Sequence, residues 1–236
     1  MSYGRMTNEA RQAILGSIRT HLAASVPYDV RELAVEVSTG SDSDRVDFAR
    51  KAPAAVSVTD LFKQNLETVD GHCVVAKGEA EVAHALTRII SDLQKTKLRA
   101  QWIAISEVPL VERLLYLTDL EIEALSITPS ASEIFGFDVG ITTAQAAIAE
   151  TGTLVLDSAD ERHRLVSLVP PVHIAIVDAS RIVGTLGEAL TLLRQGKEIS
   201  PAVTFVTGPS RTADIELTLT IGVHGPQELY VIVRQD

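Results

Sequence analysis

From about residue 58 onward, short apolar runs alternate with longer amphipathic segments, and this alternation most constrains the fold. Runs such as Trp102–Ile105 and His173–Val177 are apolar at almost every position, as strands are when both of their faces are buried. The segments between the runs carry apolar residues at helical spacing. Together they predict an α/β fold: a mostly parallel, doubly wound sheet with helices on both faces.

The boundaries of these elements follow from where the apolar patterns begin and end. We expect helices at 59–69, 79–95, 107–117, 142–150 and 184–196, and strands at 73–76, 102–105, 122–127, 153–156, 173–177 and 203–206.

The end of the chain has a different pattern. Apolar and polar residues alternate from Ile215 to Ile221, Gly222–Pro226 breaks the run, and Leu229–Val233 resumes it. Two strands joined by such a turn predict a C-terminal antiparallel hairpin at the sheet edge. A short helix over 212–217 is the alternative.

The first quarter of the chain lacks the α/β alternation. Residues 7–24 have the spacing of an amphipathic helix that ends before Pro27, and residues 36–57 are rich in Ser, Asp and Gly. We therefore divide the chain into an N-terminal helix with a flexible linker, residues 1–57, and an α/β domain, residues 58–236.

Composition excludes several classes of protein. The net charge is −10, whereas nucleic-acid binding requires a basic patch, so no nucleic-acid partner is expected. No apolar run approaches the roughly 18 residues of a membrane span, and no signal peptide is recognisable, which predicts a cytoplasmic protein. The single cysteine, Cys73, cannot by itself ligate an iron–sulfur cluster, and no His-x-x-x-His pair supports zinc. We expect neither a cofactor nor a metal in this chain.

Because ligands bind outside the carboxyl ends of parallel strands, loops after strands are candidate sites. In the first such loop, Glu150 is a candidate base or nucleophile, and Thr151, Gly152 and Thr153 are candidates for binding the substrate. The alternative is structural: Gly152 ends a helix in the left-handed conformation, and Glu150 is solvated.

A second loop, Asp160–Arg164, has two arginines around a histidine that could clamp a carboxylate, although mixed charges of this kind also form solvated turns. His173 begins an apolar strand and is expected to be a core histidine rather than a catalyst.

The third loop, Thr207–Glu216, is the strongest candidate. Its backbone N–H groups and the side chain of Arg211 could hold an anion, and Asp214 could act as a base or orient one. The loop could equally be a tight turn whose Ser210 and Asp214 bond to nearby backbone. The other residues assigned to substrate binding here are Gly208, Ser210 and Thr212.

His224 lies between two glycines and is a candidate catalytic residue that titrates near neutrality, or else it caps the hairpin. We expect these loops to gather into one pocket for a small carboxylate.

Six segments of the chain resemble a known family, the LutC/YkgG (LUD-domain) lactate-utilisation proteins, most closely over residues 135–236. They are Asp138–Thr142, Ala149–Thr153, Val166–Pro170, His173–Val177, Thr207–Glu216 and Gly222–Pro226.

The resemblance implies a fold similar to that of the sugar-phosphate isomerases and CoA transferases. It also implies a non-redox subunit that acts with iron–sulfur partner proteins in the oxidation of L-lactate to pyruvate. Two alternatives stay open: a stand-alone isomerase or transferase that acts on a phosphosugar or an acyl-CoA through Glu150, and a purely structural adaptor.

Overall fold

The computed structural model of the chain describes residues 12, 15–17, 19–20, 57–127, 129–158, 164–195, 200, 202–213, 219–221 and 225–236. The chain separates into two units, residues 1–50 and 51–236. In the first unit the described residues are helical and fall inside the predicted helix 7–24. The predicted linker up to residue 56 lies outside the described residues.

The second unit is built on a sheet of six strands, and every neighbouring pair is parallel. In spatial order the strands are β1 (His72–Lys77), β12 (Glu228–Gln235), β7 (Val172–Asp178), β4 (Val139–Thr143), β2 (Trp102–Ile105) and β3 (Ala124–Ile127). The central strands are buried on both faces: in β7, Ile174 and Ile176 belong to one core cluster, and Ala175 and Val177 to another.

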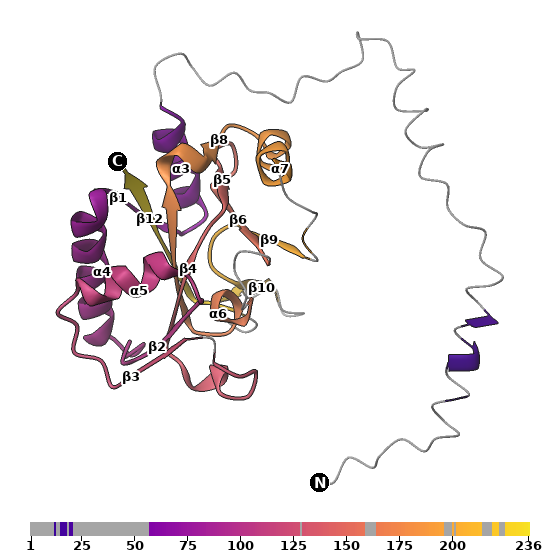
Figure 1. Ribbon diagram of the computed structural model, residues 1–236, viewed down its shortest axis with the longest axis horizontal. Coiled ribbons are helices and arrows are strands. Elements are labelled where there is room, and N and C mark those ends of the chain that lie inside the picture. Colours follow the sequence, from indigo (N-terminus) through magenta and orange to yellow (C-terminus); the bar gives the residue numbers. More distant parts are fainter. Residues whose placement is uncertain are drawn as a thin grey trace. The chain divides into compact units, whose positions relative to one another are not determined.

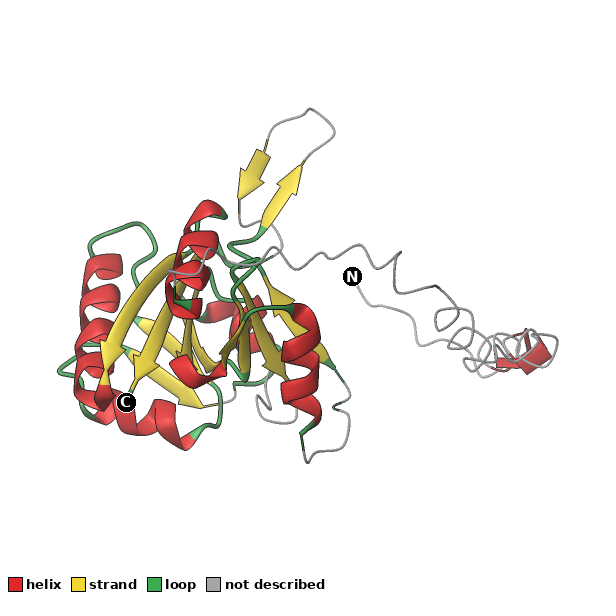
Figure 2. Cartoon of the chain, turned by 90° about the horizontal axis from the view of Figure 1, so that it is seen from above, coloured by secondary structure: helices red, strands yellow, loops and turns green. Residues whose placement is uncertain are grey.

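Helices cover both faces of this sheet (Figures 1 and 2). One face packs against α4 (Gly78–Gln94) and α5 (Pro109–Tyr116), and the other against α3 (Val58–Thr68) and the short α6 (Leu165–Leu168). Ser57 caps the N-terminus of α3: its hydroxyl oxygen accepts a hydrogen bond of 3.0 Å from the backbone N–H of Asp60. The predicted α/β fold class is thus confirmed.

A second, smaller sheet lies on the α3 side. Its strands are β8 (Ile182–Val183), β5 (Ala146–Ile148), β6 (Thr153–Asp157) and β9 (Val203–Val206), in that order, and β6 pairs antiparallel with both of its neighbours. Leu154 and Leu156 of β6 pack into the same core cluster as Ala175 and Val177 of the large sheet. Helix α7 (Leu186–Arg194) follows β8 and begins with a capping box.

The predicted helix over 142–150 is wrong, because these residues form the end of β4 and all of β5. Alanine favours helices, which explains the expectation. Packing overrides this preference: Ala147 lies in the core cluster shared with the large sheet, and Ala146 and Ile148 lie in a cluster with Ala189 of α7. A segment buried on two opposite sides with a period of two is a strand.

The antiparallel hairpin expected near the C-terminus is present, but its partners differ from the prediction. It pairs β10 (Arg211–Ala213) with β11 (Leu219–Ile221), and Figure 2 shows these short strands standing away from the large sheet. The predicted second strand, Leu229–Val233, is part of β12, which lies inside the sheet and is parallel to β1 and β7. Leu229, Val231 and Val233 lie in one core cluster and Ile232 in another, so β12 is buried on both faces, as interior strands of a parallel sheet are.

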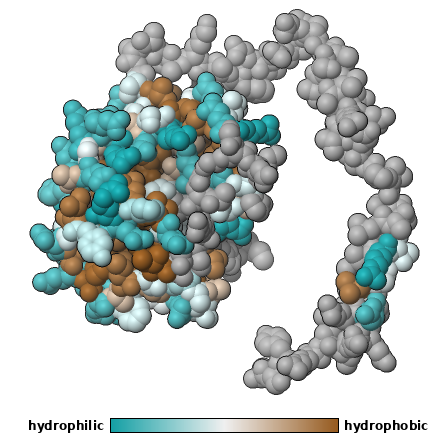
Figure 3. Space-filling model, viewed as in Figure 1, coloured by the Kyte–Doolittle hydropathy of each residue, from teal (hydrophilic) through white to brown (hydrophobic). Residues whose placement is uncertain are grey.

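Strand β3 is an open edge of the large sheet, next to an apolar surface. Leu125 and Ile127 of β3 are nearly half exposed and line a hollow of about 280 Å³ together with Leu115 and Tyr116 of α5. Hydrophobic side chains gather on this lower part of the molecule in Figure 3. Within the described part of the chain, no helix has both the length and the apolar character to cross a membrane.

Candidate functional site

The order of the strands defines a switch point between β2 and β4. The chain leaves β2 towards β3 at one edge, whereas after β4 it proceeds to β7 and β12 in the opposite direction. Two neighbouring strands whose connections diverge leave a crevice outside their carboxyl ends, and open α/β sheets bind ligands there.

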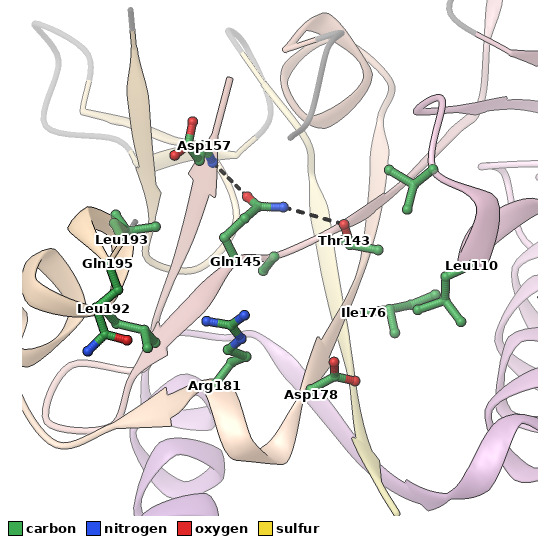
Figure 4. Close-up of a pocket in the computed structure, with 12 residues that line it drawn as sticks. Leu110, Thr143, Gln145, Asp157, Ile176, Asp178, Arg181, Leu192, Leu193 and Gln195 are labelled. Atoms are coloured by element: carbon green, nitrogen blue, oxygen red, sulfur yellow. Dashed lines mark hydrogen bonds between the residues drawn. The ribbon is translucent and has the colours of Figure 1, made fainter. Parts of the chain in front are cut away.

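A pocket of about 360 Å³ lies at this position (Figure 4). It extends from the carboxyl ends of β2, β4 and β7 to strand β6 of the smaller sheet and to helix α7. Its polar lining is Thr143, Gln145, Asp157, Asp178, Arg181 and Gln195, and its apolar lining is Val108, Leu110, Ala144, Ile176, Leu192 and Leu193.

The side chain of Gln145 is held in one orientation. Its Oε1 accepts a hydrogen bond of 2.6 Å from the backbone N–H of Asp157, so the amide nitrogen is on the other side, 3.4 Å from the Thr143 hydroxyl. Because an amide nitrogen is only a donor, Gln145 presents a fixed donor to the pocket.

The two carboxylates of the lining point away from Arg181 (Figure 4). Asp178 accepts a hydrogen bond of 2.6 Å from Nε of Arg234, and this ion pair neutralises its charge. Asp157 is 4% exposed at the end of β6.

The Asp178–Arg234 pair continues into a network behind the pocket. Arg234 Nη1 is 3.8 Å from Oε1 of Glu79, and Arg113 binds Glu79 with two hydrogen bonds of 2.8 and 2.5 Å. These bonds from Arg113 hold the pKa of Glu79 below its usual range. The network fixes Asp178 at the end of β7.

Arg181 is the positive charge available in the pocket. It ends the short 3-10 helix Ala179–Arg181 that follows β7, and its guanidinium points towards Gln145 (Figure 4). The side chain is exposed and makes no salt bridge with any residue that the structure describes. Helix α5 begins at the same pocket, since Val108 and Leu110 line it, and its positive N-terminal dipole adds to the field of Arg181.

The predicted site residues of the first loop lie elsewhere, at the turn between β5 and β6. Glu150 is exposed, and its Oε1 accepts a hydrogen bond of 3.1 Å from the backbone N–H of Leu186 at the start of α7. Thr153 Oγ1 is 2.7 Å from both Thr151 Oγ1 and Thr207 Oγ1, so the hydroxyls form a chain. Glu150 therefore stabilises the first turn of α7 in this structure, and it does not line the pocket.

Gly152 has the predicted left-handed conformation, with φ of +65°, but in a hairpin turn rather than at a helix end. A Cβ atom there would lie 2.3 Å from the backbone nitrogen of Leu66 in α3. Asn65 of the same helix donates a hydrogen bond of 2.7 Å to the carbonyl of Ala149. The turn is thus packed directly on α3.

The third loop meets the same helix. Gly208 has φ of +79°, and a Cβ atom there would lie 2.4 Å from the carbonyl oxygen of Val69. Arg211 forms a salt bridge with Asp70, just before β1.

The backbone N–H of Ser210 donates a hydrogen bond of 2.8 Å to the Pro226 carbonyl, just before β12. The third loop therefore lies at the amino ends of β1 and β12, opposite the carboxyl ends at which ligands were expected.

The remaining predicted residues lie outside the described residues or have undescribed side chains. Asp214, His224 and loop residues 160–163 lie outside the described residues. Thr212 lies in β10, but its side chain is not described. The structure brings the first and third loops together at α3. A common carboxylate pocket that includes Asp214 and His224 stays a prediction.

His173 is a core histidine, as expected. It is fully buried, its Nε2 lies 2.8 Å from the hydroxyl of Thr142, and its Nδ1 has no hydrogen-bond partner among the residues that the structure describes. Burial lowers the pKa of His173 from 6.5 to about 4, so the ring is neutral at physiological pH.

Sequence reasoning missed the pocket around Arg181, although a signal was present. Asp157 and Asp178 each directly follow a fully apolar run, where a strand ends, and Arg181 comes three residues after Asp178. Thr143 and Gln145 were hidden by the assignment of 142–150 to a helix. Within the described residues, no group of His, Cys, Asp and Glu side chains is arranged to hold a metal ion.

Fold and pocket together define an α/β protein with a ligand-sized pocket at the switch point of a parallel sheet. A comparison with known structures agrees with this fold: a crystal structure of a DUF162 family protein from Deinococcus radiodurans matches with a TM-score of 0.54 at 21% identity, covering 76% of this chain and 99% of that one.

The family model of the LUD domain matches residues 59–233, and the chain therefore belongs to the LUD-domain family. Similar proteins include "Lactate utilization protein C" of Bacillus licheniformis, 42% identical over 103 residues, and that of Bacillus subtilis, 43% identical over 103 residues. Each alignment covers 42% of this chain and 43% of the relative, which is less than half of the relative's length.

Proposed function

We propose that this chain is a component of an L-lactate utilisation system, in which it binds a small carboxylate and acts with iron–sulfur partner proteins. The observation that carries the proposal is membership of the LUD-domain family together with relatives named lactate utilization protein C. The pocket at the switch point supports it, because a guanidinium that has no salt bridge among the described residues, beside the fixed donor of Gln145, suits a small carboxylate.

The cysteine content supports a division of labour between this chain and its partners. Oxidation of lactate to pyruvate releases two electrons, which need an acceptor. Cys73 is the only cysteine; it is buried, and burial raises the pKa of its thiol to about 12. A single buried thiol cannot ligate a cluster of the Cys₄ type. Electron transfer would therefore take place on partner proteins.

Growth on lactate tests the role. A strain that lacks the gene should fail to grow on L-lactate as sole carbon source and should grow normally on glucose. The wild-type gene and a Cys73→Ala variant should both restore growth, because the thiol has no redox role in this proposal. Normal growth of the deletion strain on lactate would contradict the proposal.

A second experiment tests the partners. Affinity purification of the tagged chain from lactate-grown cells should recover cysteine-rich proteins together with iron and labile sulfide, whereas the chain purified alone should carry no iron. Purification of the tagged chain from these cells without any iron-bearing protein would contradict the part of the proposal that concerns partners.

A further inference from the structure

We infer that the pocket at the carboxyl ends of β2, β4 and β7 is the carboxylate site, and that Arg181 is its anchor. The ligand class, a short 2-hydroxy- or 2-oxocarboxylate, rests on the proposed function. The position of the site rests on the geometry alone.

The charge of the pocket favours a ligand with a single negative charge. Arg181 is its one described cation without a salt bridge, whereas Asp178 is neutralised by Arg234, and Asp157 points away from Arg181 (Figure 4). A guanidinium matches a carboxylate with two parallel hydrogen bonds. A monoanion therefore matches the single charge of Arg181, whereas a phosphate dianion would bring a second negative charge into a pocket that also contains the carboxylate of Asp157.

Neutral hydrogen-bonding groups also line the pocket near Arg181. The amide nitrogen of Gln145 is a fixed donor, because its oxygen is occupied by the backbone N–H of Asp157. The Thr143 hydroxyl lies next to it, 3.4 Å away. An amide nitrogen carries two hydrogens, so Gln145 can donate one to Thr143 and the other to the oxygen on the carbon next to the carboxylate, which a 2-hydroxy or 2-oxo acid has and acetate lacks.

The size and the apolar walls of the pocket suit a small ligand. Its volume of about 360 Å³ lies within the roughly 300–1,000 Å³ of typical ligand sites. Leu110 and Ile176 on one side and Leu192 and Leu193 on the other form apolar walls. These walls suit a short hydrocarbon chain.

The test is titration calorimetry of the purified full chain with L-lactate, pyruvate, acetate and inorganic phosphate. We expect lactate and pyruvate to bind, acetate to bind more weakly, and phosphate not to compete. Arg181→Gln should weaken binding of lactate roughly 10- to 100-fold, the usual effect of losing a charge-assisted hydrogen bond.

Two further arginine variants make the result specific. Arg88→Gln removes an exposed arginine of α4 outside this pocket and should bind as the wild type does. Arg211→Gln tests the loop that the sequence favoured. If Arg211→Gln abolishes binding and Arg181→Gln does not, the site lies at the third loop and the inference is overturned. Thermal melting of each variant separates lost binding from lost folding.

The outcomes also separate this inference from the proposed function. If the wild-type chain binds neither lactate nor pyruvate while the gene is still required for growth on lactate, the pocket assignment fails and the proposed role stands. If the chain binds lactate through Arg181 while the deletion strain grows normally on lactate, the pocket stands and the proposed role fails.

Discussion

Replacing Gly152 by alanine tests whether this residue serves packing rather than substrate binding. The glycine has φ of +65°, a conformation that costs an alanine about 1 kcal/mol. The new Cβ would also lie 2.3 Å from the nitrogen and 2.6 Å from the Cα of Leu66. Both are backbone atoms, so α3 must shift, at an overpacking cost of about 1–3 kcal/mol.

Together these costs should lower the free energy of unfolding by about 2–4 kcal/mol, and the melting temperature by roughly 4–16 °C for a chain of this size. Urea denaturation followed by circular dichroism measures the change. Gly78→Ala is the matched control, since Gly78 has φ of +64° with no atom near the new Cβ, and should lose only the backbone contribution. If Gly152→Ala is no more destabilising than Gly78→Ala, the close packing of the turn on α3 is refuted.

Three further predictions concern the buried residues Gly140, His173 and Cys73. Gly140→Ala places a Cβ 1.8 Å from the carbonyl oxygen of Val166 and should destabilise the chain by about 1–3 kcal/mol in urea denaturation; an unchanged midpoint would show that α6 does not pack on β4 so closely. The pKa of His173 is about 4 when folded and 6.5 when unfolded, so stability is full above pH 6.5 and falls towards pH 4. His173→Gln should remove from that pH range a slope of about 1.4 kcal/mol per pH unit, and an identical slope in the variant would contradict the buried neutral ring. Because burial raises the pKa of the Cys73 thiol to about 12, a thiol reagent should label it only in denaturant, and rapid labelling of the native chain would argue against its burial.

The candidate site was only partly within reach of the sequence. The composition of the loops 149–153 and 207–216 stood out, and the structure does bring Thr153 of the first and Thr207 of the second together. Their glycines and polar groups are used for contacts with α3 and with Asp70 at the amino ends of the strands. Arg181 and Gln145 did not stand out, because Arg181 lies in no glycine-rich loop and the segment of Gln145 has the composition of a helix.

The sequence by itself determined the type of most elements, because the periods that distinguish helix from strand are local. The apolar runs at 102–105 and 173–177 are strands, and the amphipathic segments at 59–69 and 79–95 are helices, as predicted. The alanine-rich segment 142–150 is the exception, since its helical preference yields to burial on two sides.

Only the tertiary structure decided the order and pairing of the strands. β12 lies between β1 and β7, and this pairing joins residues such as Cys73 and Val231, which are far apart in the chain. Pairing at such a distance leaves no local pattern in the sequence. The switch point depends on the positions of β2, β4 and β7 in the sheet, so only the tertiary structure shows that Arg181 lies beside it and that Arg211 lies at the opposite end of the strands.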